Sequence, residues 1–183
     1  MVGTFGSTVL GSVWTIIITA ALTAFATFWS GYILEVRKRN LDRLALAASI
    51  LAEIEAIMRL FTQLRIEENY RVVQAEMKKK LEASEQWTEM PGDALAFPVT
   101  VYEKCADRIG NLGADIATDV VRFYNFLSGF RVGVRIAMGT SNLPLNSRIA
   151  SISFLLDILS TEKPKAEALQ RKLQDVVSRR LFT

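Results

Sequence analysis

Histidine is absent from this sequence of 183 residues, and cysteine occurs only once. Without histidine the chain lacks the commonest general base and the commonest metal ligand of proteins. A single cysteine excludes an internal disulfide and a zinc site built from several cysteines. The net charge of +3 is too small to indicate nucleic acid, so no nucleic-acid partner is predicted. We therefore predict no catalytic residue, no metal and no cofactor.

Charge is also missing from residues 1–34, and every Lys, Arg, Asp and Glu lies from Glu35 onward. Residues 8–34 form an uncharged stretch of 27 residues. A bilayer core about 30 Å thick needs about 20 apolar residues in a helix, so this stretch predicts a retained transmembrane helix. A cleaved signal peptide is the alternative, because residues 24–26 (Ala-Phe-Ala) are similar to a cleavage site. Against it, the first residues lack a basic region and the apolar run continues past that site.

The residues that follow the stretch predict its orientation. Lys and Arg near the end of a span favour the cytoplasmic side, whereas the N-terminal side offers only the α-amino group. We therefore expect an anchor of residues 1–36 with its N-terminus outside, and a cytoplasmic domain of residues 37–183. Membrane lipid is an expected partner. The basic cluster at this membrane interface consists of Arg37, Lys38, Arg39 and Arg43.

Small residues recur every four positions along the predicted span. This spacing places them on one ridge, where a second helix can approach closely and threonine hydroxyls can bond across the contact. The alternative is that each hydroxyl bonds the carbonyl four residues earlier and the ridge faces lipid. The unbroken series favours contact with a second copy of the chain or with another membrane protein. Its members are Ser7, Gly11, Thr15, Thr19, Thr23, Thr27 and Gly31.

Apolar residues spaced three or four apart predict amphipathic helices in residues 37–183, with almost no strand signal. Residues 65–85 are more polar, and we interpret them as the exposed distal end of a long stalk. Glu53 is placed off the first apolar stripe, among the charges. That stripe consists of Leu41, Leu44, Ala48, Leu51, Ile54, Ile57, Phe61 and Leu64.

Further helices are predicted at residues 99–109 and 116–138 and from Leu145 to the end, with a break at residues 110–113 and a loop at 139–146. Pro164 is interpreted as a restart or a kink. Charges within 116–138 argue against a second span, because each costs about 2.5–3.5 kcal/mol at the bilayer centre. The predicted fold is all-α, with one transmembrane helix continuing into an antiparallel bundle of three to four helices.

The chain offers few groups for catalysis or for binding a metal. Cys105 lies on the apolar side of its predicted helix and is interpreted as a core residue. Asp115 and Asp119 share a helix face, but two carboxylates are too few for a metal site. Gly129 and Gly133, spaced four apart within a predicted helix, each cost about 1 kcal/mol relative to alanine. We interpret these glycines as positions where another helix approaches closely, within the bundle or at a partner surface, because such a contact offsets the cost.

Residues 97–126 resemble a segment of uncharacterised bacterial membrane proteins that have a single span. The resemblance consists of the Phe-Pro of residues 97–98 with Tyr102, the Ile-Gly-x-Leu of residues 109–112 and the Val-Val-x-Phe-Tyr of residues 120–124. It implies a bacterial inner-membrane setting, and it implies no activity.

The leading functional hypothesis is a membrane-anchored, non-enzymatic adaptor or accessory subunit that acts through helix–helix contacts. The alternative is a membrane-active effector, phage- or defence-related, in which threonine hydroxyls of oligomerised spans line a wet path. A third hypothesis is an enzyme whose site uses only Asp, Glu, Lys, Tyr or Arg. The small-residue ridge and the lack of predicted catalytic residues favour the adaptor hypothesis.

Overall fold

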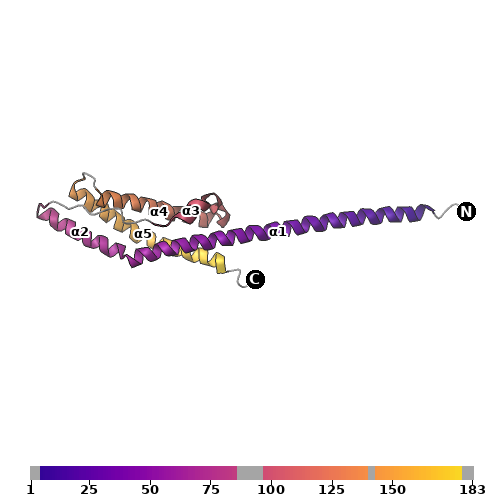
Figure 1. The fold of residues 1–183 in the computed structure, drawn as a ribbon, viewed down its shortest axis with the longest axis horizontal. Coiled ribbons are helices and arrows are strands. Elements are labelled where there is room, and N and C mark those ends of the chain that lie inside the picture. The colour runs from indigo at the N-terminus through magenta and orange to yellow at the C-terminus, as the bar shows by residue number, and fades with distance from the viewer. Residues whose placement is uncertain (1–4, 86–96, 140–142, 179–183) are drawn as a thin grey trace. The chain divides into compact units, whose positions relative to one another are not determined.

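The computed structural model describes residues 5–85, 97–139 and 143–178, and within the first helix it describes side chains from Ile18 onward. Every element in these ranges is helical, so the all-α prediction is confirmed (Figure 1). The chain divides into two units, Met1–Arg43 and Leu44–Thr183. The elements are α1 (Phe5–Gln63), α2 (Ile66–Glu82), α3 (Thr100–Cys105), the 3₁₀ helix η1 (Ala106–Leu112), α4 (Ala114–Met138) and α5 (Leu145–Ser178).

The first unit contains the N-terminal part of α1, and residues 35–40 are helical without a break. Its described side chains are exposed although most are apolar, among them Leu22, Phe25 and Phe28 at 63%, 63% and 73% of their maximal exposure. Within the ranges that the structure describes, no helix has both the length and the apolar character needed to cross a bilayer. The predicted span begins in residues 8–17, whose side chains lie outside the described part.

The second unit begins with the last turns of α1, whose buried face differs from the predicted stripe. The prediction is right from Leu51 to Phe61. It is wrong at Leu41 and Leu64, which are 59% and 46% exposed, and at Ala48, which is exposed, while Leu44 is half-buried. Leu41 precedes the second unit, and Leu64 lies in the turn after α1. The buried face consists of Leu46, Ala47, Ile50, Leu51, Glu53, Ile54, Ile57 and Phe61.

The expected stalk at residues 65–85 is wrong. Arg65 adopts a left-handed conformation, with φ 43° and ψ 44°, and this turn ends the first helix. The helix that follows, α2, packs along α5 and buries Ile66, Tyr70 and Met77. A single residue outside the right-handed region redirects the chain, which allows a polar helix to cover the core instead of extending from it.

The remaining helices complete the bundle around α4 and α5, which pack against each other. The apolar series predicted for α4 is buried at Val120, Phe123, Leu127, Phe130 and Val134, as expected. The predicted break at residues 110–113 is smaller than expected. The helix η1 extends to Leu112, and the turn falls on Gly113, whose φ of 94° suits glycine. α5 continues through Pro164.

Aromatic rings from four segments fill the core beside the end of α1. Phe130 lies at their centre and is 1% exposed. Its ring centroid lies 5.4 Å from that of Phe61, 6.1 Å from Tyr70, 5.8 Å from Phe126 and 6.3 Å from Phe97. These pairs join α1, α2, α4 and the segment before α3, so one ring couples parts of the chain that are distant in sequence.

Candidate functional site

In the described part of the small-residue ridge of α1, the hydroxyls of Thr23 and Thr27 form hydrogen bonds within their own helix. Thr23 donates its hydroxyl hydrogen to the carbonyl of Thr19 at 2.8 Å, and Thr27 donates to the carbonyl of Thr23 at 2.8 Å. A Cβ added at Gly31 would meet nothing within 4 Å. The described end of the ridge therefore has room beside Gly31, and the hydroxyl hydrogens of Thr23 and Thr27 are already donated to their own helix. Gly11 and Thr15 lie outside the described side chains.

Aromatic and basic side chains follow this ridge in order. The rings of Phe25 and Trp29 stack with centroids 5.9 Å apart, and Trp29 lies 6.2 Å from Tyr32. All three are exposed. Arg39 of the basic cluster forms an ion pair with Glu35 at 2.9 Å between Nε and Oε1. The other members, Arg37, Lys38 and Arg43, are exposed as well. An apolar surface followed by aromatic rings and then by cations is the order typical of a membrane boundary.

Glu53 forms the most constrained polar site of the second unit. Its carboxylate is buried, with the residue 7% exposed. Oε1 accepts the backbone N–H of Val101 at 2.7 Å, and Oε2 accepts the N–H of Tyr102 at 3.1 Å and the hydroxyl of Tyr124 at 2.5 Å. Three donors satisfy a charge that would otherwise be costly to bury. The carboxylate thereby fastens the start of α3 to α1 and α4.

Tyr124 completes this site. Burial, followed by its hydrogen bond to Glu53 and the charge of that carboxylate, raises the pKa of the Tyr124 hydroxyl well above its ordinary value. The phenol therefore stays protonated and can donate. Its ring also stacks on that of Tyr102, with centroids 3.9 Å apart. These hydrogen bonds and the ring stacking hold α1, α3 and α4 in a fixed arrangement around the Glu53 carboxylate.

The sequence prediction missed Glu53, although the spacing contained the signal. Glu53 lies three residues after Ile50 and four before Ile57, both fully buried. These offsets place all three side chains on one helix face. The predicted apolar stripe leaves Glu53 off the buried face, among the charges. Its nearest polar partners lie 48 to 71 residues away, where no local pattern reveals them.

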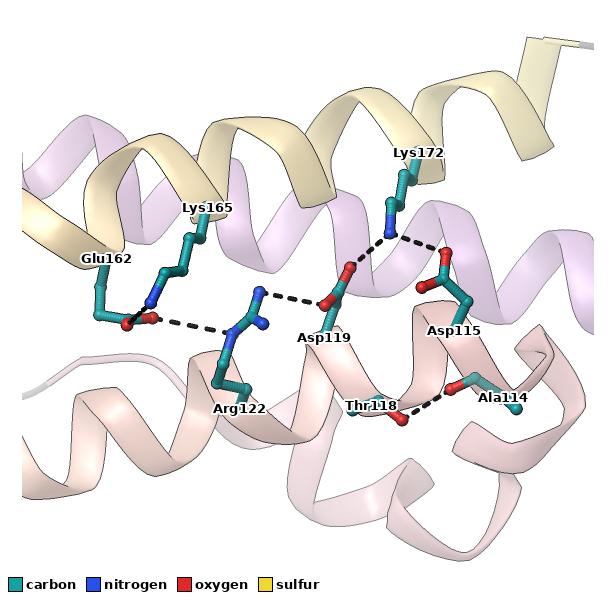
Figure 2. Close-up of polar contacts among 8 residues, drawn as sticks. All are labelled: Ala114, Asp115, Thr118, Asp119, Arg122, Glu162, Lys165 and Lys172. Atoms are coloured by element: carbon teal, nitrogen blue, oxygen red, sulfur yellow. Dashed lines mark hydrogen bonds and ion pairs between the residues drawn. The ribbon is translucent and has the colours of Figure 1, made fainter.

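A second polar group joins α4 to α5 at the surface (Figure 2). Nζ of Lys172 lies 2.7 Å from a carboxylate oxygen of Asp115 and 2.7 Å from one of Asp119. The hydrogen bonds that Lys172 donates to Asp115 and to Asp119 raise the pKa of its ammonium group. Asp119 also pairs with Arg122 at 3.0 Å, and Arg122 lies 3.8 Å from Glu162. The two aspartates that share a helix face therefore hold an ammonium group.

The pair of Lys172 with Asp115 contributes little to stability, because both side chains are exposed and solvent screens their charges. Glu162 extends the polar group through Lys165, at 2.5 Å. Across the ranges of the chain that are described, no three His, Cys, Asp or Glu side chains are grouped so as to hold a metal ion. Cys105 is half-buried and packs against the core.

The two glycines of α4 lie in different surroundings. A Cβ added at Gly133 would lie 2.6 Å from Cδ2 of Leu155 on α5, which marks a close approach of the two helices. A Cβ added at Gly129 would meet nothing within 4 Å. Gly129 is exposed on the outer side of α4, together with Val121, Val132 and Ile136. Gly133 thus belongs to packing inside the bundle, whereas Gly129 lies on its surface.

Substitutions at these glycines are expected to change stability in opposite directions. Gly129→Ala should raise the free energy of unfolding by up to about 1 kcal/mol, because alanine favours the helix and its methyl group has room. Gly133→Val should lower it by about 1–3 kcal/mol, because Leu155 is 1% exposed and has little space to move. Urea denaturation followed by circular dichroism measures both. The combined loss in the double variant Gly133→Val with Leu155→Ala should be smaller than the sum of the two single losses, whereas strictly additive effects would contradict this contact.

Alkaline pH is expected to destabilise the bundle through Tyr70. Burial raises the pKa of its phenol to about 12 from 10.0. The folded state thus favours the neutral phenol of Tyr70. The contribution of this phenol to the free energy of unfolding is complete below pH 10 and is lost as the pH rises toward 12. The loss should reach on the order of 2–3 kcal/mol. Tyr70→Phe should show a correspondingly shallower decline of unfolding free energy over this interval, and parallel curves for the two proteins would be the contrary result.

Comparison of the chain with protein-family models, with curated proteins and with solved structures gives no match.

Proposed function

We propose that this protein is a membrane-anchored, non-enzymatic adaptor or accessory subunit that acts through helix–helix contacts. One observation carries the proposal. Residues 8–34 contain no charge, and their described part, from Ile18 onward, exposes apolar side chains. A helix with this surface is stable in a lipid environment, where apolar side chains need no cover from the rest of the protein.

The flanking residues support one orientation. The cluster at Arg37, Lys38, Arg39 and Arg43 follows the apolar stretch, so we place the second unit in the cytoplasm and the N-terminus outside a bacterial inner membrane. Trp29 and Tyr32, which are 52% and 59% exposed, suit the interface between lipid and water. Alkaline carbonate extraction of membranes tests the anchor. The full chain should remain in the pellet, and release into the supernatant would refute membrane anchoring.

Two surfaces support a role in contacts between helices. In the first unit the ridge from Thr19 to Gly31 is narrow, and a neighbouring backbone could approach it closely. In the second unit α4 exposes an uncharged strip that includes Val121, Gly129, Val132 and Ile136. Among the described residues nothing lies within 4 Å of a Cβ added at Gly129, and a glycine on such an exposed helix face is consistent with a partner helix at that position.

The ridge supplies the decisive test. Thr19→Leu should prevent close approach of a second helix while leaving membrane insertion intact, because leucine is favourable in lipid. We expect crosslinking or co-purification with the partner to fall by about tenfold or more at equal membrane abundance, the effect of losing about 1.4 kcal/mol. The partner is a second copy of the chain or another membrane protein.

Ala21→Leu is the matched control. It makes a similar small-to-large change two positions along the helix, which places it on the opposite face. It should leave association unchanged. Equal association of Thr19→Leu and the unmodified chain would show that the ridge faces lipid, and recognition would then fall to the second unit.

A further inference from the structure

A groove of about 330 Å³ lies within the second unit where α1 ends and α2 begins. This volume falls at the lower end of the range of small-molecule sites, about 300–1,000 Å³. Side chains of four helices form its walls, and half of them are apolar. The apolar ones are Met58, Phe61, Ile66, Phe126, Leu159 and Ala166.

The rim of the groove carries an excess of positive charge. Arg71 pairs with Glu67 at 2.7 Å, and Arg65 lies 3.6 Å from Glu68 in a looser pair. Lys163 adds a third cation to these two pairs. All three cations are exposed, so a bound anion could reach them without displacing a buried group.

The backbone at the rim is strained. Arg65 has a positive φ of 43°, a conformation that is unfavourable for a side chain with a Cβ and that is found at ligand clamps more often than elsewhere. The turn is held by Asn69, whose Nδ2 donates to the carbonyl of Leu64 at 2.8 Å. It separates the last turn of α1 from the first turn of α2, and it places the guanidinium group of Arg65 at the mouth of the groove.

We propose that this groove binds a single-chain amphiphile with an anionic head group. The acyl chain would lie against the rings of Phe61 and Phe126, and each buried methylene contributes about 0.8 kcal/mol. The head group would lie at Lys163 and Arg65, since the loose pair of Arg65 with Glu68 leaves its guanidinium able to turn toward an anion. A carboxylate or a phosphate satisfies this chemistry. The site is independent of the proposed anchor, because all of its residues belong to the second unit.

Photo-crosslinking tests the inference on the full chain in phosphatidylcholine nanodiscs. A medium-chain fatty acid with a diazirine near its methyl end serves as the probe, and peptide mass spectrometry locates the label. We expect label in the peptides that contain residues 58–66 and 159–166. Label confined to residues 18–34, or label that excess unmodified fatty acid does not displace, would overturn the proposal.

Charge reversal at the rim provides the matched pair of variants. Lys163→Glu should reduce labelling about fivefold. Lys79→Glu, at an exposed position of α2 outside the groove, makes the same change in net charge and should leave labelling unchanged. Equal labelling of the two variants would overturn the role of the rim.

Competition experiments identify the head group. An alkyl phosphate and the fatty acid of equal chain length should each displace the probe, and the stronger competitor assigns the head group to phosphate or to carboxylate. The uncharged alcohol of that length should compete at least fivefold less well. Competition by the alcohol as strong as by either anion would contradict recognition of an anionic head.

Discussion

Phe130→Ala is expected to lower the free energy of unfolding of the second unit by about 3–5 kcal/mol. The ring is 1% exposed and contacts four other aromatic rings, so its removal leaves a cavity lined by side chains from separate segments. Because a domain of this size is stable by only about 5–15 kcal/mol, the loss is a large share of the total. Urea denaturation of the full chain, followed by circular dichroism, measures it.

Phe154→Ala is the control for this prediction. Phe154 lies on α5 and is 64% exposed, so its removal should change the unfolding free energy by no more than about 0.5 kcal/mol. The two variants lose the same atoms and differ in burial. Similar losses from both would contradict the position of Phe130 at the centre of the core.

Glu53→Ala is expected to release the start of α3 from α1 and α4. The hydroxyl of Tyr124 and the N–H groups of Val101 and Tyr102 lose their acceptor together. Each buried donor without an acceptor costs about 1–3 kcal/mol, and water can reach the two half-buried N–H groups. We therefore expect a loss of about 2–5 kcal/mol. Hydrogen exchange by mass spectrometry should show reduced protection of residues 100–112 before the rest of the bundle opens.

Two variants separate hydrogen bonding from shape at this site. Glu53→Gln keeps the volume and one acceptor oxygen, so it should lose less stability than Glu53→Ala. Glu55→Ala removes a half-buried carboxylate two residues along the same helix and should leave the protection of residues 100–112 unchanged. Unchanged protection in Glu53→Ala would show that α3 is held by its apolar contacts alone.

Much of the helical architecture could be predicted from local pattern. In α4 the predicted apolar series recurs at helical spacing, and its members Val120, Phe123, Leu127, Phe130 and Val134 are all buried. A helix with one apolar stripe must bury that stripe, so its period predicts both the element and its inner face. The charge-free stretch of residues 8–34 is likewise a property of the sequence alone. The membrane setting inferred from it stays a prediction.

Predictions from the local sequence pattern were wrong where a residue adopts a conformation that is unusual for its type. Arg65 occupies the left-handed region, where glycine or asparagine is the usual residue, so no local signal announced the end of α1. Because the sequence pattern does not predict the turn at Arg65, it predicts that residues 65–85 extend away from the core. The two glycines of α4 have the same sequence signature, yet only Gly133 contacts α5.

The sequence by itself determined the helical class, the apolar face of α4 and the separation of an uncharged segment from a charged one. Only the tertiary structure decided that Glu53 is buried, that α2 covers α5, and that a groove with a cationic rim forms beside Arg65. The physical reason is distance along the chain. Helical periodicity is set by neighbours three or four residues away, whereas Glu53 is satisfied by a hydroxyl 71 residues later. Burial of a charge depends on such partners, and folding alone brings them together.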